Sequence, residues 1–156
     1  MHAYSRVGFT FSAAAVAFAA LTIAPTLAAD TAYPTTVKSS PRVPVSLTTC
    51  RFYHNDYVLK AENNASNKTN NFLMSYVVRW TVFDHSGTMI GQSDQSFAFD
   101  TDLAPGDSIH RDEQPGDLHM SEPGSAIGHA TCRLQSAKFE GGKSWTFGRI
   151  WKGKLL

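Results

Sequence analysis

Residues 72–83 read FLMSYVVRWTVF. Large apolar side chains take every second position, and polar side chains such as Ser75, Arg79 and Thr81 stand between them. Successive side chains of a strand point to opposite faces of a sheet, so this period of two is typical of a strand with one buried face. The stretch therefore predicts a central strand. Its buried face is expected to carry Phe72, Met74, Tyr76, Val78, Trp80 and Val82.

Turn-forming residues border this strand on both sides. Residues 63–71 are polar and rich in Asn, which predicts a loop, and residues 84–87 supply a turn. After residue 29, apolar residues nowhere recur at helical spacing for ten residues. About seven short strands separated by turns predict an all-β fold, an antiparallel β-sandwich. The other predicted strands are residues 45–53, 57–62, 88–99, 108–111, 126–139 and 144–151.

The last two predicted strands are joined by Glu140-Gly141-Gly142-Lys143. Glycine adopts a positive φ without steric cost, and tight hairpin turns demand such angles. The two adjacent glycines therefore predict a hairpin at the C-terminal end of the chain.

Three stretches resemble the motifs of FxLYD-type domains, which are small bacterial domains of exported proteins. Trp80-Thr81-Val82-Phe83-Asp84, followed by Gly87, resembles the F-x-L-Y-D...G signature. Residues 61–64 (AENN) resemble the strand-ending G-x-V-x-N, with Ala61 in place of Gly, and residues 103–107 (LAPGD) resemble the L-x-P-G-E/D turn. The similarity spans about residues 57–110. It implies an immunoglobulin-like β-sandwich and an exported, accessory or binding role, and it brings no catalytic residue.

The first 29 residues resemble a secretory signal peptide. Arg6 precedes an apolar run at residues 7–23, and small residues follow up to Asp30. Cleavage is predicted after Ala28 or Ala29. The alternative is an uncleaved membrane anchor, but the run is mostly Ala, contains hydroxyl residues and falls short of the roughly 20 strongly apolar residues that a span prefers. We expect a secreted or periplasmic protein with no stable membrane insertion after cleavage.

Residues 30–44 contain three prolines among Thr and Ser. Such composition favours an extended, weakly ordered leader over packed structure. The folded domain is therefore predicted to span residues 45–156, which is enough chain for one core and too little for two domains.

Charge and composition narrow the class of partner. The chain has 156 residues, of which 42% are hydrophobic and 17% charged, with a formal net charge of +1. A nearly neutral domain has no general attraction for nucleic acid, so nucleic acid is not an expected partner. The charges are unevenly placed, because residues 94–122 are mainly acidic and residues 133–154 are mainly basic. Either these stretches are solvated faces that partly neutralise each other, or one of them binds a ligand.

Cys50 and Cys132 are the only cysteines. An even cysteine count in an exported protein predicts a disulfide. The alternative is a redox pair or a set of metal ligands, but the Cys-x-x-Cys spacing of catalytic pairs is missing. We therefore expect a structural bond between these two residues.

The histidines after the signal stand singly, at positions 54, 85, 110, 119 and 129. No two of them have the i, i+2 or i, i+4 spacing that directs both side chains at one metal ion. Surface histidines are the default interpretation, with no cofactor, no catalytic residue and no metal predicted. Two ligand sites remain as alternatives: a weak calcium site at Asp100, Asp102 and Asp107, and a basic, aromatic edge at residues 145–154 that contacts an anionic surface.

The sequence contains no Gly-x-Ser-x-Gly elbow and no glycine-rich phosphate loop. The leading hypothesis is a non-enzymatic, secreted or periplasmic module that binds a protein or cell-envelope component. The first alternative is a small exported metal-binding protein or enzyme that uses the region of His119 and His129. The second is a structural accessory protein with no discrete ligand.

Overall fold

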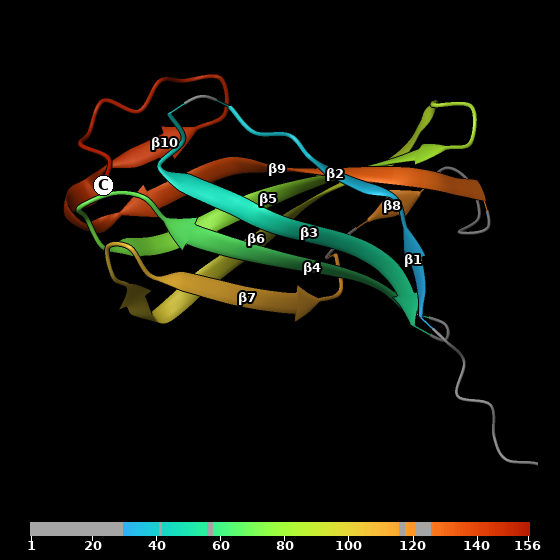
Figure 1. Cartoon of the computed structure of the whole chain (residues 1–156), viewed down its shortest axis with the longest axis horizontal. Coiled ribbons are helices and arrows are strands. Elements are labelled where there is room, and N and C mark those ends of the chain that lie inside the picture. The colour runs from blue at the N-terminus through green and yellow to red at the C-terminus, as the bar shows by residue number, and fades with distance from the viewer. Residues whose placement is uncertain (1–29, 41, 56–57, 116–117, 121–125) are drawn as a thin grey trace, which may run out of the picture.

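The structure is a computed structural model that describes residues 30–40, 42–55, 58–115, 118–120 and 126–156 (Figure 1). The predicted signal peptide, residues 1–29, lies outside the described residues. The described part contains ten strands and one short 3₁₀ helix. These elements are β1 (Thr31–Tyr33), β2 (Thr35–Val37), β3 (Val45–Asn55), β4 (Val58–Asn67), β5 (Leu73–Asp84), β6 (Met89–Leu103), β7 (Ser108–Glu113), β8 (His119–Met120), β9 (Ile127–Phe139), η2 (Glu140–Gly142) and β10 (Ser144–Thr146).

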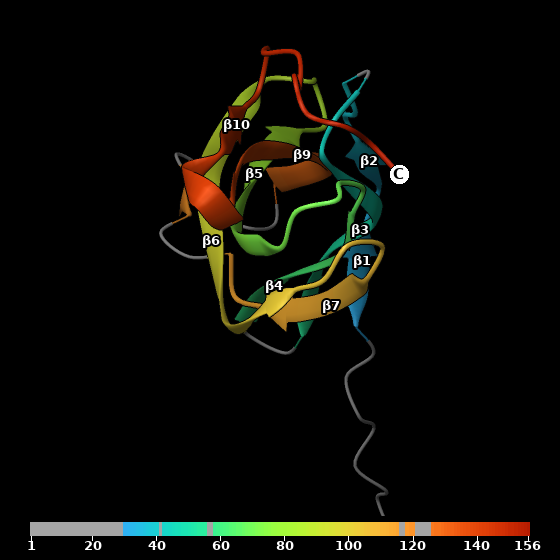
Figure 2. The ribbon, with the colours of Figure 1, turned by 90° about the vertical axis from the view of Figure 1, so that its left-hand side faces the viewer.

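The strands form two packed sheets, which confirms the predicted all-β sandwich (Figure 2). One sheet has the order β1-β3-β4-β7, and the other has the order β10-β9-β5-β6-β8. β2 joins the second sheet by pairing parallel to β9, so the sandwich is mixed rather than purely antiparallel. The described strands also exceed the seven predicted, because β1, β2 and β8 are short additions at the edges of the sheets.

The order of the longer strands follows immunoglobulin topology. In that fold, strands A, B and E share one sheet, and strands G, F, C and C′ share the other. Here β3, β4 and β7 correspond to A, B and E, and β10, β9, β5 and β6 correspond to G, F, C and C′. β5 is therefore a central strand, as predicted, and it pairs with β6 on one side and β9 on the other.

The predicted alternation of β5 is confirmed from Tyr76 to Val82 and is wrong before it. Tyr76, Val78, Trp80 and Val82 are fully buried, whereas Phe72 is 42% exposed and Met74 is 45% exposed. The reason is a register shift between Leu73 and Ser75 in the pairing with both neighbouring strands. A bulge of this kind adds one residue and exchanges the two faces of the strand, so Leu73 is buried there instead.

Residues 30–40 and 42–44 are not a weakly ordered leader outside the domain. β1 pairs with β3, and β2 pairs with β9, so this segment contributes one strand to each sheet. The hydroxyl of Thr35 donates to the carbonyl of Tyr33 and accepts from the amide of Phe52 at 3.2 Å, and the ring of Tyr33 packs against that of Phe52. The edges of β3 and β9 supply backbone hydrogen-bond partners to β1 and β2. These pairings order a segment whose own composition does not predict strands.

The Asn-rich segment at residues 63–71 is only partly a loop, because β4 continues to Asn67. Asn63 and Asn67 are fully buried. The side chain of Asn63 accepts a hydrogen bond of 3.0 Å from the hydroxyl of Tyr76. The side-chain nitrogen of Asn63 has no partner among the described residues, whereas that of Asn67 donates to three backbone carbonyls. Tertiary hydrogen bonds offset part of the cost of burying these amides, and the strand does not end at Glu62 as predicted.

Candidate functional site

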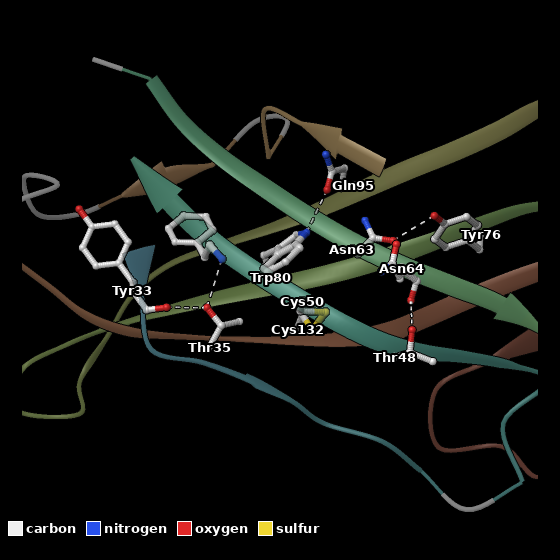
Figure 3. Close-up of a disulfide and its surroundings, with 11 residues drawn as sticks. Tyr33, Thr35, Thr48, Cys50, Asn63, Asn64, Tyr76, Trp80, Gln95 and Cys132 are labelled. Carbon is white, nitrogen blue, oxygen red and sulfur yellow. Dashed lines mark hydrogen bonds between the residues drawn. A yellow bond between two sulfur atoms is a disulfide. The ribbon is translucent and has the colours of Figure 1, made fainter. Parts of the chain in front are cut away.

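The predicted disulfide is present and joins the two sheets (Figure 3). Cys50 lies on β3 and Cys132 on β9, with their Cα atoms 6.5 Å apart. Trp80 stands opposite Cys132 in the pairing of β5 with β9, and its ring centroid lies 5.9 Å from that of Phe52. A buried tryptophan beside an inter-sheet disulfide is typical of immunoglobulin domains, where the bond joins strands B and F. Here the bond joins the strands that correspond to A and F.

A chain of hydrogen bonds runs from Trp80 on β5 through Gln95 on β6 to the segment that follows β7 of the first sheet. The indole N–H of Trp80 donates to the side-chain oxygen of Gln95 at 3.0 Å (Figure 3). The side-chain amide of Gln95 donates in turn to the carbonyl of Gln114 at 2.9 Å. Every donor in this chain has an acceptor, which is the condition for burying polar groups without a penalty. Trp80 and Cys132 therefore form part of the structural core, and the chemistry of a ligand must be sought elsewhere.

The structure does not gather the histidines. His129 stacks on Phe83 with ring centroids 4.7 Å apart, and His110 lies 2.9 Å from the side-chain oxygen of Asn64. His119 is on β8, and β5 and β6 stand between β8 and the strand of His129. Three spacings of about 4.8 Å between neighbouring strands place the backbones of His119 and His129 about 14 Å apart.

His54 lies on β3, and His85 lies in the turn after β5, where its backbone is next to Gly128, the residue before His129. Among the residues that the structure describes, no group of three His, Cys, Asp or Glu side chains could hold a metal ion. The suggested calcium site at Asp100, Asp102 and Asp107 is therefore not assembled.

A pocket of about 470 Å³ lies at the C-terminal end of the chain, where the sequence indicated a basic, aromatic edge. We call it the basic pocket. Figure 1 shows this end of the chain beside β10, at the far end of the sandwich from β1. Its lining contains three basic residues and no carboxylate. The lining residues are Lys143, Ser144, Trp145, Arg149, Ile150, Trp151, Lys152 and Gly153.

The hairpin of β9 and β10 builds one side of this pocket. β10 pairs with β9 as predicted, and Gly141 and Gly142 both have positive φ in the turn between them. The predicted strand at residues 144–151 is too long, because β10 ends at Thr146. Gly148 has φ +85° and the amide of Arg149 donates to the carbonyl of Thr146, so the chain turns there.

Two buried tryptophans fix the pocket. The indole N–H of Trp145 donates to the carbonyl of Arg149 at 2.6 Å, which holds the turn against β10. Trp151 packs on Phe139 with ring centroids 4.9 Å apart. Trp145 is 3% exposed and Trp151 is 7% exposed, so both rings act as internal supports. Phe147 and Ile150, which lie between them, are exposed to solvent.

The basic side chains around the pocket have no acidic partner in the described part of the chain. The ion pairs of the described residues lie away from the pocket, for example between Arg79 and Asp94 and between Arg51 and Glu62. Lys143 donates a hydrogen bond of 3.0 Å to the side-chain oxygen of Asn71, which is neutral. The acidic residues 94–122 and the basic residues 133–154 therefore form no ion pair with each other among the described residues, and the positive charge at the pocket stays available.

A second feature of the pocket is a donor without an acceptor. The indole nitrogen of Trp151 is buried and has no hydrogen-bond partner among the described residues. A Cβ atom on Gly153 would lie 2.6 Å from that nitrogen, so only glycine fits beside the indole edge. Buried donors are rarely left unpaired in proteins.

The outer face of the first sheet carries a separate polar network that the sequence did not indicate. The hydroxyl of Tyr53 donates to the carboxylate of Asp112 at 2.8 Å, and the guanidinium of Arg51 lies 4.2 Å from the centroid of the Tyr53 ring. Burial and the hydrogen bond to Asp112 raise the pKa of Tyr53 to about 12. Burial also raises the pKa of Tyr76 strongly. Only the pairing of β3, β4 and β7 brings Arg51, Tyr53 and Asp112 together.

These two tyrosines give a testable dependence of stability on pH. Unfolded tyrosine ionises near pH 10, whereas the folded chain keeps Tyr53 and Tyr76 protonated to higher pH. Their contribution is complete below pH 10 and is lost as the pH rises toward 12, because the unfolded tyrosines ionise in this range and lower the free energy of the unfolded state, whereas the folded tyrosines stay protonated. Denaturant unfolding at pH 8, 10 and 11 is expected to show this fall. The double variant Y53F/Y76F should have a shallower slope, and equal slopes would contradict the assignment.

Comparisons with known proteins bear on the fold. A scan against protein-family models finds no match, and neither does a search of curated proteins. Among solved structures, the chain is similar to a hypothetical protein from Peptoclostridium difficile 630, with a TM-score of 0.51 and 8% sequence identity. The similarity covers 70% of this chain and 89% of the other. At this identity the comparison shows a shared fold alone.

The described residues contain no helix that is long and apolar enough to cross a membrane. The disulfide between Cys50 and Cys132 is of the kind that forms and persists in oxidising compartments outside the cytoplasm.

Proposed function

We propose that the chain is an exported, non-enzymatic binding module that holds an anionic component of the cell envelope at the basic pocket. The signal-like residues 1–29 and the disulfide support export to the periplasm or the medium. A sandwich with rigidly held loops suits binding, because the scaffold positions the loop side chains before the ligand arrives.

One observation carries the proposal: Lys143, Arg149 and Lys152 surround one pocket, and no carboxylate lines it. Cations gathered without counter-ions repel one another and raise the local concentration of anions. Guanidinium and ammonium groups are also the usual donors to carboxylate, phosphate and sulfate oxygens. An anionic ligand is therefore the class that this pocket fits best.

We also propose membership of the FxLYD-type group. Its support is the position of the three similar stretches. Residues 61–64 lie in β4, Trp80 to Gly87 form the end of β5 and the turn into β6, and residues 103–107 form the turn into β7. In that last turn Gly106 has φ +85°, a conformation that favours glycine. Two of the three stretches thus occupy a strand end and the turn that follows it, whereas residues 61–64 lie within β4, which continues to Asn67.

Binding to immobilised heparin tests the proposed function, with the chain as recovered after export. The charge-reversed variant K143E/R149E/K152E is expected to bind about tenfold or more weakly at low salt, mainly through slower association, and the difference should shrink as salt rises. The matched control is K38E/R42E/K60E, which has the same net charge but alters no residue of the pocket lining.

The control separates the pocket from net charge. Equal losses in both variants would show that overall charge alone governs binding, and the proposal would then be wrong. No loss in either variant would favour the structural accessory protein. Elemental analysis of the same material is the check on the remaining alternative, because stoichiometric zinc or copper would favour a metal-binding protein that uses His119 or His129.

A further inference from the structure

An apolar side chain stands among the cations of the basic pocket. Ile150 is 71% exposed, follows Arg149 directly and lines the same pocket as Lys152. Phe147, in the same turn, is 36% exposed, and the guanidinium of Arg133 lies 4.1 Å from the centroid of its ring. The turn therefore presents apolar surface surrounded by positive charge.

The conformation of this turn is fixed in advance. The hydrogen bonds from Trp145 to Arg149 and from Arg149 to Thr146 close it, and Trp151 anchors its end in the core beside Phe139. Ile150 stays exposed because its neighbours on both sides are held, so it cannot fold back onto the core. A side chain that is exposed in a held conformation loses little entropy when a partner covers it.

The arrangement of three cationic side chains around the exposed Ile150 favours one class of partner. A soluble polyanion satisfies the cations but offers nothing apolar to Ile150. The surface of an anionic bilayer presents a layer of phosphate groups directly above hydrocarbon, and clusters of Lys and Arg beside exposed apolar residues bind such surfaces. We propose that the basic pocket docks on an anionic phospholipid surface, with Lys143, Arg149 and Lys152 facing the headgroup phosphates and Ile150 entering the layer below. This inference rests on the proposed function and names its partner.

The contact is peripheral, and its two parts contribute differently. Each basic residue near an anionic membrane surface contributes roughly a factor of five in affinity, so losing three costs about a hundredfold. Burial of most of one Ile side chain contributes about tenfold. The charge contribution falls with salt, whereas the apolar contribution does not.

Co-sedimentation with vesicles tests the inference, using the exported chain and two lipid compositions: phosphatidylcholine alone, and phosphatidylcholine with 30% phosphatidylglycerol. The unaltered chain is expected to bind the second and not the first. K143Q/R149Q/K152Q should lose about a hundredfold in vesicle affinity, and I150S about tenfold at every salt concentration, while I150L keeps the affinity. The N-terminus is the same in every variant, so only the pocket differs.

The outcomes separate this inference from the proposed function. Heparin binding that depends on Lys143, Arg149 and Lys152, without binding to phosphatidylglycerol vesicles, overturns the lipid assignment and leaves the proposed function standing. Absence of both overturns both. Vesicle binding that I150S leaves unchanged contradicts entry of Ile150 into the bilayer. If K143Q/R149Q/K152Q binds vesicles as well as the unaltered chain does, the membrane contact lies outside the basic pocket and the inference is wrong.

Discussion

Replacement of Cys50 by Ser is expected to lower the free energy of unfolding by about 4.5 kcal/mol. The bond to Cys132 joins residues 82 positions apart in the sequence, and closing a loop of that length removes about this much conformational freedom from the unfolded chain in the simplest model. The effect is large because the loop that the bond closes is long, with a sequence separation of 82. Denaturant unfolding, followed by tryptophan fluorescence, measures the loss.

The single variants C50S and C132S and the double variant C50S/C132S should lose similar amounts, because each removes the same bond. Reduction of the unaltered chain should reproduce the loss and leave the variants unaffected. The assignment fails if oxidised and reduced proteins unfold at the same denaturant concentration, or if the denatured, unreduced protein has two free thiols.

Replacement of Asn67 by Ala is expected to lower the free energy of unfolding by about 4 kcal/mol, because several buried groups lose their partners at once. The side-chain amide of Asn67 donates to the carbonyls of Asn71, Leu103 and Ala104. Its side-chain oxygen accepts from the amide and the hydroxyl of Thr69. One fully buried side chain thus ties the end of β4 to the turn that leads into β7.

Asn70 supplies the matched control, because it lies in the same polar segment and is exposed. N70A should change the free energy of unfolding by no more than about 0.5 kcal/mol, as is usual at exposed sites. Thermal and denaturant unfolding of both variants measure the contrast. Equal effects of N67A and N70A would mean that the hydrogen bonds of Asn67 do not support the fold.

Local pattern was sufficient to predict the main strands. The alternation from Tyr76 to Val82 predicted β5, because a period of two arises when successive side chains of a strand point to opposite faces of a sheet. Gly141 and Gly142 predicted the hairpin of β9 and β10, because a turn requires particular backbone angles whatever surrounds it. Two cysteines with no third candidate left a single possible pairing.

Long-range pairing decided what the local pattern could not. The bulge near Leu73 exposed Phe72 and Met74, and no residue type marks a bulge in advance. β1 and β2 exist because β3 and β9 offer unpaired edges to a proline-containing segment. Asn63 and Asn67 are buried because their partners, Tyr76 and the turn after β6, arrive from distant parts of the sequence.

The candidate site divides in the same way. The sequence by itself determined that positive charge and tryptophan gather at residues 145–154, that the chain is a β-sandwich, and that Cys50 and Cys132 pair. Only the tertiary structure decided that Lys143 joins Arg149 and Lys152 around one pocket, that both tryptophans face inward, and that Ile150 is left in solvent. The physical reason is that the composition of a segment fixes which charges it carries but not where its side chains point. The direction of these side chains depends on the turn at Gly148, which follows β10. It depends also on the core residues against which the tryptophan rings pack, such as Phe139 for Trp151.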